Sequence, residues 1–131
     1  MNCSSRREQP RKLTATDSLW LNFATAMNNK NIDFLLANSL DSISCVDCEP
    51  NNSGTDKRVH DAEYLYMNLM PELRYLNDLT ATKFSTFEDS TSIKVNYSIK
   101  SNNALEGSYN LIFILELVNG NFYLAERTFV P

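Results

Sequence analysis

The cysteines and the histidine are the residues of this chain whose types best suit metal or redox chemistry. Cys45 and Cys48 form one CxxC pair, and His60 is the single histidine. A tetrahedral zinc site needs four ligands, and a thioredoxin-type centre needs its CxxC at the start of a helix. This pair instead closes a predicted strand, so we predict no metal and no cofactor, and either a local disulfide or two unreactive thiols. His60 is expected at the start of a helix, as a surface residue rather than a catalytic base.

Glu126 is the carboxylate that the sequence places in the most apolar surroundings. The Asn119-Gly120 pair predicts a type I′ hairpin turn, because both positions tolerate positive φ. In a regular hairpin built on that turn, Glu126 faces Phe113 on an otherwise apolar side of the strands. A carboxylate that loses hydration there can act as an acid or base, or bind the polar end of an apolar ligand.

Tyr97 is predicted to reach the same surface from the preceding strand. If Ile99 pairs with Tyr109, then Tyr97 lies beside Leu111 and two strands away from Glu126. Glu126 with Tyr97 or Tyr109 is therefore the candidate catalytic combination. The predicted ligand pocket consists of Trp20, Tyr97, Tyr109, Phe113, Leu124 and Glu126.

The opposite face of the same hairpin combines apolar and charged side chains. Such a face is too apolar for free contact with solvent and too polar for a core, which is typical of an interface. Because a lone domain with this patch tends to associate, we predict a homodimer. The predicted dimer interface consists of Ile112, Ile114, Tyr123, Arg127 and Phe129.

Three helices are predicted before the last four strands. Thr14 and Asp17 form a T-x-x-D start signal for a first helix, which an Asn/Lys run at 28–31 ends. A second helix follows over 32–40, and a third runs from residue 60 to about residue 79 after a long loop. The predicted strands lie at 42–46, 83–89, 93–99, 108–118 and 121–130.

Length and charge limit the function classes. The chain has 131 residues, enough for one domain, and a net charge of −4. The basic residues near its start form a predicted disordered tail at 1–12, which leaves residues 13–131 as an acidic domain that would repel nucleic acid. The longest apolar run, Leu111–Leu115, is too short to cross a bilayer. The compartment stays open between the cytoplasm and export as a lipoprotein, since Cys3 begins a small polar stretch.

The order helix, helix, short strand, helix and four strands resembles the nuclear transport factor 2-like superfamily, also called ketosteroid isomerase-like or cystatin-like. Residues 19–48, with the aromatic pair Trp20 and Phe23, are similar to uncharacterised bacterial members of that group. The resemblance implies an α+β fold in which a curved antiparallel sheet wraps a helix and leaves a cone-shaped apolar pocket. No segment matches the catalytic motifs of the superfamily residue by residue.

Three functions therefore remain open. The first is a non-catalytic small-molecule-binding or structural domain, with itself as partner and a small apolar ligand in the cone. The second is an isomerase, dehydratase or cyclase that uses Glu126 with Tyr97 or Tyr109. The third is an interaction module that binds a different protein through the mixed hairpin face.

Overall fold

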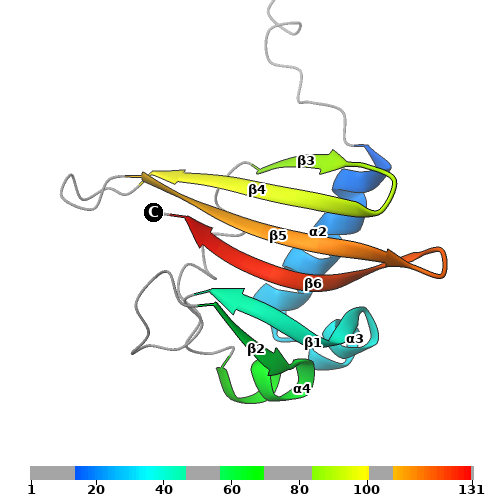
Figure 1. Ribbon diagram of the computed structural model, residues 1–131, viewed down its shortest axis with the longest axis vertical. Helices are drawn as coiled ribbons and strands as arrows, with labels where there is room; N and C mark the ends of the chain where they lie inside the picture. Colours follow the sequence, from blue (N-terminus) through cyan, green and yellow to red (C-terminus); the bar gives the residue numbers. More distant parts are fainter. Residues whose placement is uncertain (1–13, 47–56, 70–83, 101–107, 131) are drawn as a thin grey trace, which may run out of the picture.

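Residues 14–46, 57–69, 84–100 and 108–130 are described by the computed structural model, so the predicted tail at 1–12 lies outside them. The helical elements are α2 (Ala15–Asn29), α3 (Ile32–Ala37), α4 (Ala62–Tyr64) and a π-helical turn, η1 (Leu65–Leu69). The strands are β1 (Ser39–Val46), β2 (Lys57–Asp61), β3 (Phe84–Glu88), β4 (Ser92–Lys100), β5 (Ser108–Val118) and β6 (Asn121–Val130). In Figure 1, α2 crosses behind a curved sheet, and α3 and α4 lie beside β1 and β2.

The first helix begins and ends where local chemistry predicts. The Thr14 hydroxyl accepts from the Asp17 backbone N–H at 3.0 Å, and the Asp17 carboxylate accepts from the Thr14 N–H at 3.1 Å. This capping box satisfies two N–H groups of the first turn. Lys30 ends α2 in the left-handed region, with φ of 57°. α3 then ends at Ala37, earlier than predicted, because the carbonyl of Asn38 accepts from the Leu124 N–H at the start of the β1–β6 pairing.

The six strands lie in the order β2-β1-β6-β5-β4-β3. β1 and β6 run parallel, and all other neighbours are antiparallel. The predicted α+β architecture with a curved sheet is confirmed, whereas the prediction of a purely antiparallel sheet is wrong.

β2 was not predicted. Residues 57–59 were predicted to lie in a loop and His60 at a helix start. His60 instead lies in β2 and pairs with Ile43 of β1. Pairing supplies partners to a strand edge that would otherwise stay open, which outweighs weak local helix preference. Residues 70–79 of the predicted third helix lie outside the described part.

The β5–β6 hairpin follows the predicted register only near its turn. Asn119 and Gly120 have φ of 51° and 87°, and Val118 pairs with Asn121 as predicted. The pairing then shifts between Leu115 and Ile114, with Ala125 left as the extra residue of a β-bulge. Beyond the bulge the β6 side chains of Glu126, Arg127 and Thr128 lie on the face opposite to the predicted one, whereas the β5 side chains of Phe113 and Leu111 stay on the predicted inner face.

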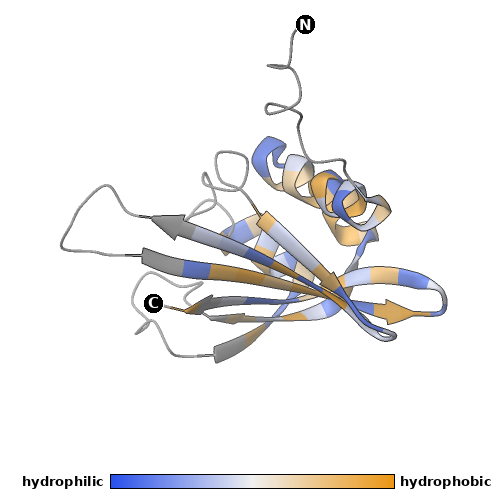
Figure 2. Ribbon diagram, turned by 90° about the horizontal axis from the view of Figure 1, so that it is seen from above, coloured by the Kyte–Doolittle hydropathy of each residue, from blue (hydrophilic) through white to orange (hydrophobic). Residues whose placement is uncertain are grey.

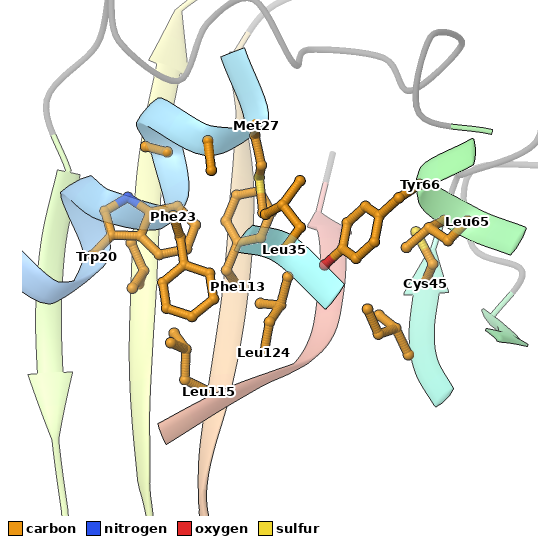
Figure 3. Packing of buried hydrophobic residues seen from close by; sticks show 14 of the residues in the cluster. Trp20, Phe23, Met27, Leu35, Cys45, Leu65, Tyr66, Phe113, Leu115 and Leu124 are labelled. Atoms are coloured by element: carbon orange, nitrogen blue, oxygen red, sulfur yellow. The ribbon is translucent and has the colours of Figure 1, made fainter. Parts of the chain in front are cut away.

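One face of the sheet, which we call the inner face, packs against α2 and α3 (Figure 2). Trp20, Phe23 and Met27 of α2 meet Phe113 and Leu124 of the sheet in this core (Figure 3). Helical spacing on α2 and alternation along β5 supply the first four of these residues, and Leu124 joins them from β6. None of the helices in the described residues is long and apolar enough to span a membrane.

Candidate functional site

Four residues of the predicted ligand pocket come together on the inner face. The ring centroid of Trp20 lies 4.7 Å from that of Phe113 and 6.3 Å from that of Tyr97. Leu124 joins the same cluster. The side chains of Trp20 and Tyr97 are both 0% exposed. These side chains fill the space that they share between α2 and the sheet. The side chain of Tyr109 lies outside the described part, although its backbone pairs with Ile99 as predicted.

A buried hydrogen bond fixes the polar atoms of this cluster. The indole Nε1 of Trp20 donates to the hydroxyl oxygen of Tyr97 at 2.8 Å. Burial raises the pKa of the Tyr97 phenol, and the bond from Trp20 opposes part of that shift. A phenol held in this way is neutral at physiological pH, and its oxygen already accepts a hydrogen bond from Trp20.

Glu126 does not lie with these residues. It pairs with Ile114 rather than Phe113, so the predicted Phe113–Glu126 pair is wrong. Its half-buried side chain accepts a hydrogen bond from the Thr128 hydroxyl at 2.7 Å. Tyr97 pairs with Leu111 on the inner face, as predicted, so the bulge puts Tyr97 and Glu126 on opposite faces of the sheet.

Arg127 takes the inner position that Glu126 was expected to hold. It pairs with Phe113 of β5 and with Cys45 of β1, and only 4% of it is exposed. Its Nη1 donates to the Cys45 sulfur at 3.7 Å. Its predicted place at the edge of a dimer interface is therefore wrong. The consecutive apolar residues Leu124 and Ala125 interrupt the alternation of β6, and they are the sequence signal for this shift.

The cysteine prediction has a partial answer. Cys45 is disulfide-bonded, so the alternative of two unreactive thiols is wrong, and whether the disulfide is the predicted local one with Cys48 stays a prediction. Cys3 and Cys48 lie outside the described residues. Within the described ranges no group of three or more His, Cys, Asp or Glu side chains is arranged to hold a metal ion.

A second buried hydrogen bond, between two hydroxyl groups, was not predicted from the sequence. The hydroxyl groups of Tyr66 and Ser39 lie 2.7 Å apart, and Tyr66 points from η1 toward the core (Figure 3). Burial raises the pKa of Tyr66 to about 12, although the bond with Ser39 lowers it in part. The π-helical turn buries Leu65, Tyr66 and Leu69. Tyr66 borders the apolar stripe of Leu65 and Leu69 on a helical wheel, which is the sequence signal that could have found it.

The outer face is the side of the sheet opposite to α2. Cross-strand pairing aligns one residue from each strand in a single row across this face. Phe87 is 68% exposed at one end of the row, and Val59 is exposed at the other. From β2 to β3 the row consists of Val59, Ser44, Glu126, Ile114, Lys94 and Phe87.

Three residues of the predicted dimer interface lie on the outer face. Ile112, Ile114 and Tyr123 are each half-buried there. The side chain of Phe129 lies outside the described part, and its backbone pairs with Leu111. A hollow of about 400 Å³ also opens on this face. It is lined by Ser85, Phe87, Lys94, Asn96, Asn110, Ile112 and Val130.

No protein-family model matches the chain, and no curated protein matches it. Solved structures do match. A nuclear transport factor 2-like protein from Cytophaga hutchinsonii aligns with a TM-score of 0.53 and 11% identity, over 90% of this chain and 98% of that one. A de novo designed protein with a curved β-sheet aligns with a TM-score of 0.51 and 14% identity, over 90% of this chain and 100% of that one. The chain has the nuclear transport factor 2-like fold.

A DUF4783 family protein from Bacteroides ovatus also aligns, with a TM-score of 0.49 and 12% identity, over 81% of this chain and 88% of that one. The two alignments with TM-scores above 0.5 show the architecture, and identities this low leave the activity to the site. In this fold the described inner-face cluster is packed, and the outer face carries exposed apolar side chains beside Lys94 and Glu126.

Proposed function

We propose that this nuclear transport factor 2-like domain is a non-catalytic structural domain that forms a homodimer through the outer face of its sheet. The observation that carries the proposal is the exposed apolar surface there. Phe87, Val118 and Val130 are exposed, and Ile112 and Ile114 are half-buried beside them. Apolar patches bordered by polar groups are typical of association surfaces, since contact removes their apolar area from water.

The bulge in β6 weighs against the enzyme alternative. The predicted acid–base combination would need Glu126 near Tyr97 or Tyr109. Glu126 and Tyr97 lie on opposite faces, and the side chain of Tyr109 lies outside the described residues. Tyr97 already accepts a hydrogen bond from Trp20. A carboxylate and a phenol separated by a sheet cannot exchange protons with one substrate.

A small apolar ligand on the inner face stays a separate prediction. Such a ligand has to displace the packed side chains around Trp20 or lie beside them. Mass spectrometry of the purified protein under native conditions tests it. A stoichiometric copurified apolar molecule supports the binding function, and its chemical alteration during incubation supports the enzyme alternative.

Sedimentation equilibrium tests the homodimer. The wild-type protein is expected to sediment as a dimer at high micromolar concentration, and Ile114→Lys as a monomer, because the new charge lies at the centre of the outer face. Asn22→Lys is the matched control, since Asn22 is exposed on α2. Far-UV circular dichroism establishes that each variant is folded. A wild-type monomer, or a folded Ile114→Lys dimer, would overturn the proposal.

A further inference from the structure

The row of residues across the outer face has a charge and size pattern that complements itself. Ile114 lies on β5, with Glu126 on the β6 side and Lys94 on the β4 side. One strand further out, the small side chain of Ser44 lies beyond Glu126 and the large, exposed ring of Phe87 beyond Lys94. Neighbouring strands are about 4.8 Å apart, so the two charges lie on either side of Ile114 at equal distances.

We propose that two copies of this chain pack outer face to outer face about a two-fold axis parallel to β5 at Ile114. Lys94 of each copy then contacts Glu126 of the partner subunit. This inference rests on the proposed homodimer and specifies its geometry, its partner and its register.

Symmetry leaves two main orientations for such a pair of sheets. Identical faces can meet only if the two-fold axis lies in the plane between them. An axis perpendicular to the strands places β4 over β4 of the partner subunit and therefore brings like charges together. An axis parallel to β5 exchanges the strands on its two sides, so β4 lies over β6 of the partner subunit. Opposite charges then meet at two symmetric places, and charge complementarity selects this orientation.

The parallel axis also matches side-chain size and polarity. Phe87 falls opposite Ser44 of the partner subunit, a small residue that leaves room for the ring. In the next row, Ile112 meets Ile112 of the partner subunit, and Asn96 falls opposite Thr128 of the partner subunit. Strands related in this way are nearly aligned, as in ordinary face-to-face packing of twisted sheets.

The two charged side chains can both take part in the contact. Lys94 is exposed, and Glu126 is half-buried. Thr128 donates to one carboxylate oxygen of Glu126, and a carboxylate can accept several hydrogen bonds. Glu116 also lies on this face of β5, so the proposed axis brings it opposite Glu116 of the partner subunit. This like-charge pair is exposed toward the hairpin end, where solvent screens the repulsion, whereas the Lys94 and Glu126 pairs lie at the central row.

Charge reversal distinguishes the two axes. In the proposed dimer, Lys94→Glu places two carboxylates together at both symmetric places, and Glu126→Lys places two ammonium groups together. Each variant alone is expected to dimerise with a dissociation constant at least about tenfold higher than that of the wild type. An equimolar mixture of the two is expected to form a heterodimer, and the double variant to recover dimerisation. Asp33→Lys, which reverses an exposed charge on α3, is the control and is expected to dimerise like the wild type.

Sedimentation velocity of each variant and of the mixture measures these outcomes. If the single variants dimerise like the wild type, or if mixing gives no heterodimer, the proposed axis is wrong. If Ile114→Lys is then monomeric, the outer-face homodimer still holds and only its geometry fails. A wild-type monomer would overturn both.

Discussion

Replacing Tyr97 with phenylalanine removes one oxygen atom and isolates a single buried hydrogen bond. The Tyr97 hydroxyl accepts from the Trp20 indole at 2.8 Å, and both side chains are inaccessible to solvent. The phenylalanine ring keeps the contacts with Trp20 and Phe113, but the indole N–H then has neither this acceptor nor water. An orphaned buried donor costs about 1–3 kcal/mol, so we expect Tyr97→Phe to lose about 2 kcal/mol of unfolding free energy.

Urea denaturation followed by tryptophan fluorescence measures this loss, because Trp20 is the chain's single tryptophan. A chain of this size has an m-value of about 1–2 kcal/mol per molar urea, so the midpoint should fall by about 1 M with an unchanged slope. Wild type and variant are compared at one protein concentration, since dimerisation shifts apparent stability.

Tyr64→Phe is the matched control, because Tyr64 is 49% exposed. Its stability should stay within about 0.5 kcal/mol of the wild type. If Tyr97→Phe costs no more than this control, the buried Trp20–Tyr97 bond does not exist in solution, and the packed inner face described above is wrong.

Four further substitutions test the register and the other buried contacts. Arg127→Glu puts a carboxylate in a buried position and should lower the free energy of unfolding in urea by at least about 3 kcal/mol. Glu126→Arg should leave the stability of the subunit nearly unchanged. A larger loss for Glu126→Arg than for Arg127→Glu would contradict the bulge. Tyr66, whose pKa rises from 10.0 to about 12 on folding, keeps its proton in the folded state while the unfolded chain releases it. The contribution of Tyr66 to the unfolding free energy should therefore be fully present below pH 10 and fall by about 1.4 kcal/mol per pH unit between pH 10 and 12. Thermal melts of Tyr66→Phe should lack this pH dependence, and a variant that keeps it would refute the assignment to Tyr66. Thr86→Val removes a 2.8 Å hydrogen bond to the Asp17 carboxylate and should lower stability by about 1.5–3 kcal/mol, and an unchanged urea midpoint would show that this link between β3 and α2 contributes nothing.

Much of the fold could be predicted because it depends on short-range rules. The capping box at Thr14 and the turn at Asn119-Gly120 each involve a few neighbouring residues. The pairing of Ile99 with Tyr109 follows from a short connection between two alternating strands. Such rules involve only residues that are close together in the sequence, so the local sequence is enough to predict these features.

The features that could not be predicted depend on contacts between distant segments. β2 exists because residues 57–61 pair with the edge of β1, and local residue preferences do not encode that edge. The parallel alignment of β1 with β6 places Cys45 beside Arg127, although these residues are far apart in sequence. The hydroxyl contact between Tyr66 and Ser39 likewise joins segments that are far apart in sequence, so helical periodicity could not predict it.

The candidate site shows how one residue can reverse a functional prediction. Trp20, Phe113 and Leu124 gather as predicted, because each lies on the apolar stripe of its own element. Glu126 and Arg127 exchange faces because a single extra residue, Ala125, shifts the register between them and the turn. In a strand, a shift of one residue moves each following side chain to the other face of the sheet. The predicted pair of Glu126 and Tyr97 is therefore wrong, although Tyr97 lies where it was predicted.

An isotope-filtered nuclear Overhauser experiment on a mixture of labelled and unlabelled protein tests the outer-face homodimer most directly. It detects contacts only between different copies of the chain. We expect cross-peaks from the Ile114 methyl groups to Ile114 of the partner subunit, and from the Lys94 side chain to Glu126 of the partner subunit. Intermolecular cross-peaks that arise instead from α2, or their complete absence at concentrations where the protein is fully folded, would contradict the account.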